Sequence, residues 1–344
     1  MTVLFFTRLF YPHIGGVEKH VLEISKILVE KGHFVTVLTE KFERCLLDTD
    51  EIDGIKILRI NNGKDDWFKK FRAWKNLFRY RKLIKESDIV HAHDVFFWYL
   101  PFRFLYPRKP AYTTFHGYET NFPPSQKSII IRKITEKLSW GNICVGDYIR
   151  KWYGAKTTHI TYGGVENFQI SNIKSHVSSP ISKAKISFIG RLDKDTGIDI
   201  YLKALAILKQ KKIKFEFDVF GNGVFRKQAE KVGKVYGFIK DLSHSIEDSN
   251  IIFASSYLSM LQALALGKIV IAVYTNPLRE DYLRDSPFVR YILIFNNEKD
   301  IVSAISSILN ESYKFESMKK NGQEWARKQA WKKVVLLYLD LWKI

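Results

Sequence analysis

A pair of glycines, Gly15 and Gly16, stands between the apolar run at residues 2–7 and an amphipathic pattern that begins near Val17. Glycines lack a Cβ atom, so backbone N–H groups in such a loop can approach a ligand closely, and the positive end of the following helix favours an anion. The pair therefore suits a phosphate or a sugar-phosphate, although a simple tight turn would use the same residues. The loop has neither the glycine spacing of a dinucleotide-binding fold nor the Lys-Ser/Thr of a P-loop.

Two polar clusters follow strand-like runs in the first half of the chain, HAHD at residues 91–94 and TFHGYE at residues 114–119. His116 comes directly after the run AYTTF, so we expect its ring at a sheet edge, where it can hydrogen-bond a substrate hydroxyl. A purely structural histidine is the alternative. The histidines and carboxylates of these clusters do not have the helical spacing of a metal site, so we expect no metal.

Glycines also follow two strand-like runs in the second half. The stretch SFIGRLDKDTGID places Gly190, Arg191 and Gly197 before an amphipathic helix, and DVFGNG at residues 218–223 ends in further glycines. A cationic side chain beside a helix N-terminus is what a diphosphate requires when no metal neutralises it. The second half therefore predicts a nucleotide site.

Short β-branched and aromatic runs alternate with helical patterns along the whole chain, which is typical of parallel sheets covered by helices. These runs begin at residues 2, 34, 54, 88, 111, 142 and 158 in the first half, and at residues 185, 215, 234, 251, 269 and 289 in the second. For 344 residues we expect two α/β domains, at 1–168 and 186–320, joined by a Ser- and Lys-rich linker at 169–185. Ligands of such sheets bind beyond the carboxyl ends of the strands, so we expect the site in a cleft between the domains.

The last segment, residues 321–344, carries an apolar stripe at helical spacing. The stripe comprises Trp331, Val334, Val335, Tyr338, Leu341 and Trp342. A helix with such a stripe must dock against an apolar surface.

The formal net charge is +19, which implies an anionic partner: a nucleic acid, an anionic membrane surface or a phosphorylated substrate. The most basic stretch is residues 64–85, in which Trp67, Phe71, Trp74 and Phe78 also recur at helical spacing. This pattern predicts either a helix that packs on a sheet with a solvated basic side, or a helix that lies on a membrane surface. Both interpretations stay open here.

The N-terminus shows no signal-peptide pattern, and the longest uncharged stretch, residues 249–267, reads as a buried strand and helix and not as a membrane span. The two cysteines, Cys45 and Cys144, are far apart and outside any C-x-x-C pattern, which fits a reducing compartment. We expect a cytoplasmic protein. The membrane-surface interpretation of residues 64–85 would place it peripherally on the inner face of the membrane.

Eight motifs occur in the order YPHIGGVEKHV, HAHD, TFHG, TYGGVE, FIGRLDKDTGID, FGNG, LQALALGKIVIA and AWKKVVLLYLDLW. In this order and at these spacings they resemble the glycosyltransferase family 4 pattern (glycosyl transferases group 1) on the GT-B fold, over essentially the whole chain. The resemblance implies two Rossmann-like domains facing across a cleft, the first for the acceptor and the second for a nucleotide-sugar, with a final helix crossing back to the first. It also implies a hexosyltransferase that retains configuration and uses no metal or other cofactor.

The resemblance implies roles for individual residues. Catalytic roles fall to His116, which matches the family histidine that contacts the donor sugar, and to Arg191, which matches the arginine that holds the diphosphate. Arg191 also counts among the donor-binding residues, and the others are Gly15, Gly16, Gly190, Lys194, Thr196, Gly221, Asn222, Ser255, Ser256 and Gln262. The acceptor-binding residues are Asp94, Glu119 and Glu166.

This sequence departs from the family pattern at the donor site. Thr196 stands at the usual lysine position, and Lys194 is the candidate substitute. Of two usual glutamates, one is Gln262, whose amide can still hydrogen-bond a ribose, and the other has no counterpart. Ser255 and Ser256, or main-chain N–H groups, are the candidates for contact with the sugar instead.

Two functions therefore follow from the resemblance. The first is a glycosyltransferase that uses a UDP- or GDP-sugar and acts on a lipid-linked or surface glycan acceptor. The alternative is a catalytically degenerate subunit that binds nucleotide or glycan and supports an active partner. Nucleic-acid binding rests on charge alone, and we do not expect it. The DTD at residues 48–50 mimics the metal motif of the other glycosyltransferase fold, but we expect it in a loop away from the site and take it as coincidence.

Overall fold

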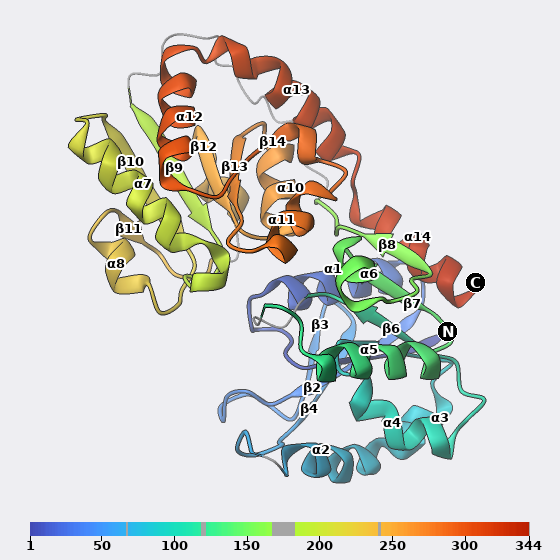
Figure 1. Ribbon diagram of the computed structural model, residues 1–344. Helices are drawn as coiled ribbons and strands as arrows, with labels where there is room; N and C mark the ends of the chain where they lie inside the picture. The colour runs from blue at the N-terminus through green and yellow to red at the C-terminus, as the bar shows by residue number, and fades with distance from the viewer. Residues whose placement is uncertain (67, 118–121, 167–182, 240–241, 344) are drawn as a thin grey trace. The chain divides into compact units, whose positions relative to one another are not determined.

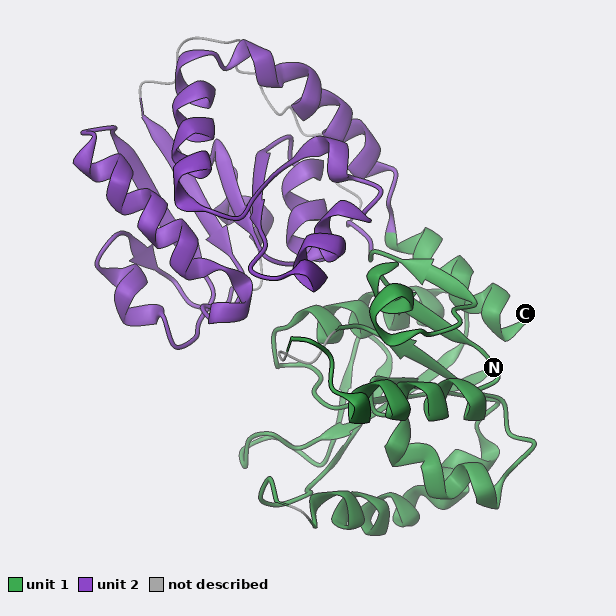
Figure 2. Ribbon diagram, in the orientation of Figure 1, with its two compact units in different colours: residues 1–163, 331–344 green, residues 164–330 purple. Residues whose placement is uncertain are grey.

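The structure is a computed structural model that describes residues 1–344 except 67, 118–121, 167–182, 240–241 and 344. It divides into two compact units (Figure 2): unit 1 comprises residues 1–163 and 331–344, and unit 2 comprises residues 164–330. Each unit is built on its own β-sheet with helices packed against it (Figure 1). No helix within the described ranges combines the length and the apolar character needed to cross a bilayer.

The described residues of unit 1 form an eight-stranded sheet in the order β3-β4-β2-β1-β5-β6-β7-β8, parallel except between β3 and β4. The strands are β1 (Thr2–Thr7), β2 (Phe34–Glu40), β3 (Thr49–Ile52), β4 (Ile55–Ile60), β5 (Ile89–His93), β6 (Ala111–Phe115), β7 (Asn142–Val145) and β8 (His159–Thr161). The helices are α1 (Gly16–Glu30), α2 (Lys69–Leu77), the 3-10 helix η1 (Phe78–Tyr80), α3 (Arg81–Glu86), α4 (Phe96–Leu105), α5 (Gln126–Leu138), α6 (Tyr148–Tyr153) and α14 (Trp331–Trp342).

Alternate side chains of the central strand β1 point to two helical layers. Leu4 and Phe6 pack with residues of α2, α3 and α4 in one buried core. Phe5, on the opposite face, has ring contacts with His93 of β5 and Trp342 of α14. Helices therefore cover both faces of the sheet, which is why its strands read as continuous apolar runs.

The apolar stripe predicted near the C-terminus is confirmed, because all six of its residues are buried on α14. α14 belongs to unit 1 and packs beside α1. Gly141 lies under this helix, and a Cβ atom at that position would stand 2.6 Å from Cδ1 of Leu341. A side chain at Gly141 would therefore require the end of the Leu341 side chain to shift.

The described residues of unit 2 form a six-stranded parallel sheet in the order β11-β10-β9-β12-β13-β14. The strands are β9 (Ala184–Ile189), β10 (Phe215–Phe220), β11 (Lys234–Val235), β12 (Ile251–Ala254), β13 (Ile269–Val273) and β14 (Ile292–Phe295). The helices are η2 (Lys194–Thr196), α7 (Ile198–Gln210), α8 (Arg226–Glu230), α9 (Leu242–Ser245), α10 (Tyr257–Ala265), α11 (Pro277–Arg284), η3 (Val289–Tyr291), α12 (Glu298–Asn310) and α13 (Tyr313–Arg327). Strands β9, β10, β12 and β13 share a buried core with α7 and α12.

The segment expected as one helical element at 321–344 is two helices, α13 and α14. Between them the backbone N–H of Val165 donates to the carbonyl of Gln329, and Val165 forms an isolated bridge with Ala330. Helical hydrogen bonding cannot continue through residues that pair with another segment. The end of the chain therefore divides between the two units.

Each predicted strand run contains a strand, but three local predictions need correction. The DTD tripeptide is only partly in a loop, because Asp48 precedes β3 whereas Thr49 and Asp50 belong to this strand, which pairs antiparallel with β4. Residues 289–291, expected to open a strand, form η3. Of the predicted linker at 169–185, residues 169–182 lie outside the described residues, and Ala184 already begins β9.

Both aspartates of the DTD tripeptide pair with cations. Asp50 accepts a hydrogen bond from Nη2 of Arg59 at 3.0 Å, and the buried Arg59 also donates to two backbone carbonyls. Asp48 is exposed and lies 2.8 Å from Nζ of Lys41. The tripeptide therefore fastens the edge strand β3 to the sheet.

Asp50→Ala should lower the free energy of unfolding by about 2 kcal/mol, because a buried guanidinium loses a charged hydrogen-bond acceptor. Asp48→Ala is the matched control and should cost less than about 1 kcal/mol, since it removes an exposed ion pair. Urea titration followed by circular dichroism measures both variants. Equal losses in the two would contradict the structural role of Asp50.

Candidate active site

Four histidines lie together at the carboxyl edge of the unit 1 sheet. His91 and His93 belong to β5, His116 follows β6, and His20 lies on α1. Nε2 of His116 is 2.8 Å from Nδ1 of His93, and the rings of His116 and His20 meet in a T-shaped arrangement with centroids 4.8 Å apart. The structure thus brings the predicted residue His116 together with three further histidines for which the sequence motifs predict no individual role.

The helix α14 closes this cluster with hydrogen bonds. The Tyr338 hydroxyl lies 2.9 Å from Oγ1 of Thr114 and 2.9 Å from Nε2 of His20. Oγ1 of Thr114 is 2.7 Å from Nε2 of His91, and Nε1 of Trp342 donates to Nδ1 of His91 at 3.1 Å. All five side chains are buried, so each of these bonds satisfies an atom that water does not reach.

Burial also keeps the cluster uncharged. Removal from water lowers the pKa of each of the four imidazoles, and the neighbouring rings lower it further. For His116 the pKa falls to about 3. Within the described ranges, no set of three or more His, Cys, Asp or Glu is placed to hold a metal ion. At neutral pH the cluster therefore offers hydrogen bonds without positive charge.

Asp94 joins the loops that follow β5 and β6. Its Oδ1 accepts a hydrogen bond from the backbone N–H of His116 at 3.1 Å, and its φ of +59° is a left-handed conformation that Asp tolerates better than most residues. The carboxylate is exposed beside His116. Of the other predicted acceptor residues, Glu119 lies outside the described residues, and Glu166 is exposed and belongs to unit 2.

The glycine loop before α1 holds a carboxylate of the chain itself. Gly15 is the N-cap residue of α1, and a Cβ atom there would collide with Oε2 of Glu18. Oε1 of Glu18 lies 2.9 Å from Nδ1 of His13, and burial raises the pKa of this carboxyl. A Cβ atom on Gly16 would meet nothing within 4 Å. The first turn of α1, where we expected N–H groups open to a phosphate, is thus partly covered by Glu18.

Three loops at the carboxyl edge of the unit 2 sheet interlock through glycines. Gly190 follows β9 with a φ of +153°, and a Cβ atom there would collide with Oγ of Ser255 after β12. A Cβ atom on Gly221, after β10, would collide with the carbonyl oxygen of Gly190. The N–H of Leu192 donates to the carbonyl of Asn222 at 2.9 Å. This packing brings predicted donor residues from three strands together.

Arg191, the predicted diphosphate ligand, binds two carboxylates in this structure. Its Nη1 lies 2.9 Å from Asp193 and its Nη2 lies 2.5 Å from Asp195. Its side chain is 52% exposed, so a ligand can reach the guanidinium. Lys194 is exposed on η2, whereas Oγ1 of Thr196 lies 2.8 Å and 2.7 Å from the carbonyl oxygens of Arg191 and Asp193. Thr196 therefore shapes the loop that presents Arg191.

The remaining predicted donor residues also have partners inside unit 2. Ser256 caps α10 in a reciprocal bond with the third residue of the helix. Nε2 of Gln262 donates to Oγ of Ser243 at 2.8 Å, which ties α10 to α9. The carbonyl of Ser255 accepts a hydrogen bond from Arg279, a buried arginine that the sequence did not single out. Contact of these residues with a donor stays a prediction.

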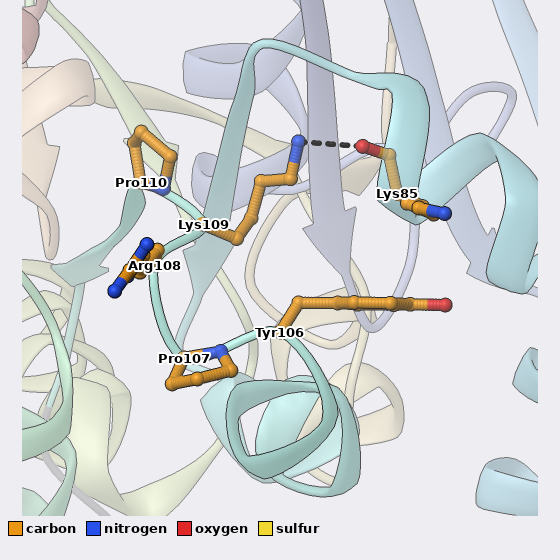
Figure 3. Close-up of a pocket in the computed structure, with 6 residues that line it drawn as sticks. All are labelled: Lys85, Tyr106, Pro107, Arg108, Lys109 and Pro110. Atoms are coloured by element: carbon orange, nitrogen blue, oxygen red, sulfur yellow. Dashed lines mark hydrogen bonds between the residues drawn. The ribbon is translucent and has the colours of Figure 1, made fainter.

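An open hollow of about 580 Å³ lies at the opposite, amino edge of the unit 1 sheet (Figure 3). It is lined by Lys85, Tyr106, Pro107, Arg108, Lys109 and Pro110. The ammonium of Lys109 donates to the carbonyls of Lys85 and Ser87, so this lysine fixes the loop before β6. The hollow contains none of the predicted site residues.

Comparison with known proteins decides the family. Residues 14–166 match Glycosyltransferase Family 4, and residues 170–325 match Glycosyl transferases group 1. The chain is a GT-B glycosyltransferase of the family 4 type. A phosphatidyl-myo-inositol mannosyltransferase of Mycolicibacterium smegmatis is 27% identical to this glycosyltransferase over 238 residues, which are 66% of this chain and 61% of that protein.

Solved structures support the GT-B fold of this glycosyltransferase. Sucrose-phosphate synthase of Thermosynechococcus elongatus has a TM-score of 0.77 at 16% identity, and the match covers 99% of this chain and 98% of that one. HepE of Anabaena, in complex with UDP and glucose, has a TM-score of 0.73 at 14% identity, with 98% of each chain covered. At these identities the likeness establishes the fold.

The neutral histidine cluster predicts that this glycosyltransferase loses stability in acid. Below about pH 6.5 the unfolded chain binds protons at these histidines, whereas the folded cluster, whose pKa values are lowered, does not. The unfolded state then holds more protons than the folded state, so the free energy of unfolding falls as pH falls from about 6.5 toward about 3, where His116 titrates. Differential scanning calorimetry should show the melting temperature falling from pH 7 to pH 5.

Two variants test whether the histidine cluster causes this pH dependence of the melting temperature. His20→Gln removes one imidazole from the cluster and should make the fall in melting temperature shallower. His244→Gln changes an exposed histidine on α9 in unit 2 and should leave the fall as in the parent protein. An unchanged slope in His20→Gln would rule out the cluster as its source.

Proposed function

We propose that this glycosyltransferase moves a sugar from a UDP- or GDP-sugar to a lipid-linked or surface glycan acceptor, with retention and without a metal or other cofactor. The proposal rests on the accessibility of the Arg191 guanidinium. This residue lies just after β9 and is close in sequence to the N-terminus of α7. Its partners are carboxylates, which an anionic diphosphate can replace. The mannosyltransferase relative supports a lipid-linked acceptor, and the UDP complex of HepE supports a nucleoside diphosphate donor.

In the proposed reaction, the bond between the anomeric carbon and the diphosphate oxygen breaks, and the acceptor hydroxyl oxygen forms the new bond on the same face of the sugar. The hydroxyl proton passes to the departing diphosphate. Arg191 stabilises the charge that develops on the leaving group, which is where a fixed cation accelerates the reaction. His116, uncharged at neutral pH, hydrogen-bonds the donor sugar.

Incubation with UDP- and GDP-sugars and a membrane lipid extract in the presence of EDTA tests this proposal. We expect transfer that EDTA does not reduce, and a product whose anomeric configuration by NMR equals that of the donor. Arg191→Ala should lower kcat by about 100-fold, on the order of 3 kcal/mol, because the leaving group loses its cation. Arg226→Ala, which removes a surface arginine on α8, should leave kcat unchanged. Full activity of Arg191→Ala would contradict the assignment.

A catalytically degenerate subunit, which binds nucleotide or glycan and supports an active partner, is the second candidate function. Gln262 stands in place of a family glutamate and is tied to Ser243, and the sequence has no acid between Asp248 and Glu280. This function predicts binding of UDP or GDP in calorimetry without consumption of any donor sugar. Turnover with one of the donors in the assay above excludes it.

The basic segment 64–85 both packs on the sheet and exposes aromatic side chains. Ala73 and Leu77 of α2 belong to the buried core. Trp74, a member of the predicted aromatic stripe, is half buried and donates from Nε1 to the carbonyl of Phe97 at 2.8 Å, while Trp67 lies outside the described residues. One face of α2 therefore packs into the core of unit 1, whereas Phe71 and Phe78 of the aromatic stripe face outward.

We propose that the outer face of this segment binds an anionic membrane surface. Phe68, Phe71 and Phe78 are exposed, and the exposed Lys75 and Lys82 recur at the same helical spacing. Exposed aromatic rings among lysines suit the headgroup region, where each cation contributes roughly 1 kcal/mol near an anionic leaflet. The glycosyltransferase would then act in the cytoplasm, peripherally bound to the inner face of the membrane.

Vesicle flotation should recover the protein with anionic vesicles and far less with neutral ones. The double variant Phe71→Ser/Phe78→Ser should reduce the bound fraction at least about tenfold, because two rings no longer enter the interface. Tyr313→Ser, at an exposed aromatic residue of α13 in unit 2, is the control and should bind as the parent does. Binding that is indifferent to lipid charge defeats the proposal.

A further inference from the structure

The hydrogen bonds of the histidine cluster fix the direction in which each proton is donated. An indole N–H can only donate, so Nδ1 of His91 accepts from Trp342. A neutral imidazole carries one proton, so the proton of His91 is on Nε2 and is donated to Oγ1 of Thr114, 2.7 Å away. The tautomer of His91 is therefore set by the C-terminal helix.

The same order of donor and acceptor continues from Thr114 through Tyr338 to His20 on α1. The Thr114 hydroxyl, which already accepts from His91, has one proton to give, and the Tyr338 oxygen lies 2.9 Å away. Tyr338 then donates to Nε2 of His20 at 2.9 Å. The reverse direction would leave the buried Thr114 proton without an acceptor among the contacts of the described residues, which is costly. His20 therefore carries its proton on Nδ1.

His93 faces a different choice, because only one of its ring nitrogens has a partner among the described residues. Nδ1 lies 2.8 Å from Nε2 of His116, and Nε2 is buried without a hydrogen bond. A buried N–H without an acceptor is rarer than an under-satisfied acceptor. The proton of His93 is therefore on Nδ1, donated to Nε2 of His116, and His116 carries its own proton on Nδ1.

We propose that His93 is a positioning residue that fixes His116 as the Nδ1–H tautomer, so that His116 donates a hydrogen bond to an oxygen of the transferred sugar. The proposal rests on the proposed function, in which His116 contacts the donor sugar. Tyr338 and Trp342 of α14 hold His20 and His91 in matching neutral tautomers, so the imidazoles beside His116 carry no charge. The Nδ1–H group of His116 then recognises a ligand oxygen that can accept a hydrogen bond.

NMR of protein labelled with 15N in its nine histidine rings tests the proposal without any turnover. Two-bond 1H–15N spectra distinguish the tautomers, and single His→Gln variants assign the signals. We expect the proton on Nε2 in His91 and on Nδ1 in His20 and His116, with all three rings neutral at pH 7. A proton on Nε2 of His116, or a charged His116 ring, overturns the proposal even if the enzyme transfers sugar.

Kinetics of two His93 variants test the consequence for catalysis. Asn can place an amide N–H near the position of Nδ1, whereas Phe keeps a ring without a donor. His93→Phe should lower kcat about tenfold, as expected for one lost orienting hydrogen bond, with a smaller change in KM for the donor, and His93→Asn should recover most of it. Equal activity in both variants, at matched melting temperatures, overturns the positioning role. Should His93→Phe not fold, or the parent not transfer sugar, the NMR result decides.

Discussion

The burial of His20, His91 and His93 against Tyr338 of α14 is the constraint on which the carboxyl edge of the unit 1 sheet depends. Rings removed from water must stay neutral, and a neutral ring has one nitrogen that can donate a hydrogen bond and one that can accept. β5, β6 and α1 supply the rings, but Tyr338 and Trp342 of α14 complete the bonds. Because these partners lie more than 200 residues away in sequence, the carboxyl edge of the sheet is complete only when the end of the chain returns to it.

The corresponding edge of the unit 2 sheet is formed by closely packed loops. Its loops must approach one another closely, and Gly190 and Gly221 allow this because any side chain would collide with a neighbouring loop. The bonds of Thr196 to carbonyls of the same loop fix the turn from which Arg191 projects. The cation is thus presented by backbone geometry, and its own side chain stays accessible.

The strands and the helical stripe of α14 could be predicted from the sequence because buried parallel strands and amphipathic helices have strong apolar periods. The edge strand β3 could not, since TDEI has no apolar alternation and is held by the pairing of Asp50 with Arg59. The break before α14 depends on a backbone bond to Val165, which no local pattern indicates. His116 and Arg191 could be predicted because each directly follows a strand-like run or lies one residue beyond it. Their partners could not: His93, which contacts His116, belongs to another strand, and Asp193 and Asp195, which contact Arg191, show no pattern that indicates the pairing.

The sequence around the glycine loop also indicates a local role for Gly15. An acid at the third position of a helix commonly reaches back over the first turn, and Glu18 stands at that position after the N-cap Gly15. The glycine therefore has a local reason, room for the Glu18 carboxylate, beside the functional reason inferred from the sequence. The sequence indicates space for a ligand at Gly15, and in the structure the Glu18 carboxylate occupies that space.

The two units share a feature that bears on how a glycosyltransferase of this kind binds an anion. In unit 1 a carboxylate of Glu18 covers the first turn of α1, and in unit 2 Asp193 and Asp195 hold Arg191. The positions at which an anionic donor is expected are therefore neutralised by the protein in this structure. In the proposed reaction, a diphosphate at Arg191 would replace Asp193 and Asp195, so the free energy gained on binding would be the difference between the two ion pairings. This exchange would lower the affinity for the donor in its ground state, whereas the charge that develops on the leaving group would strengthen its pairing with Arg191 in the transition state.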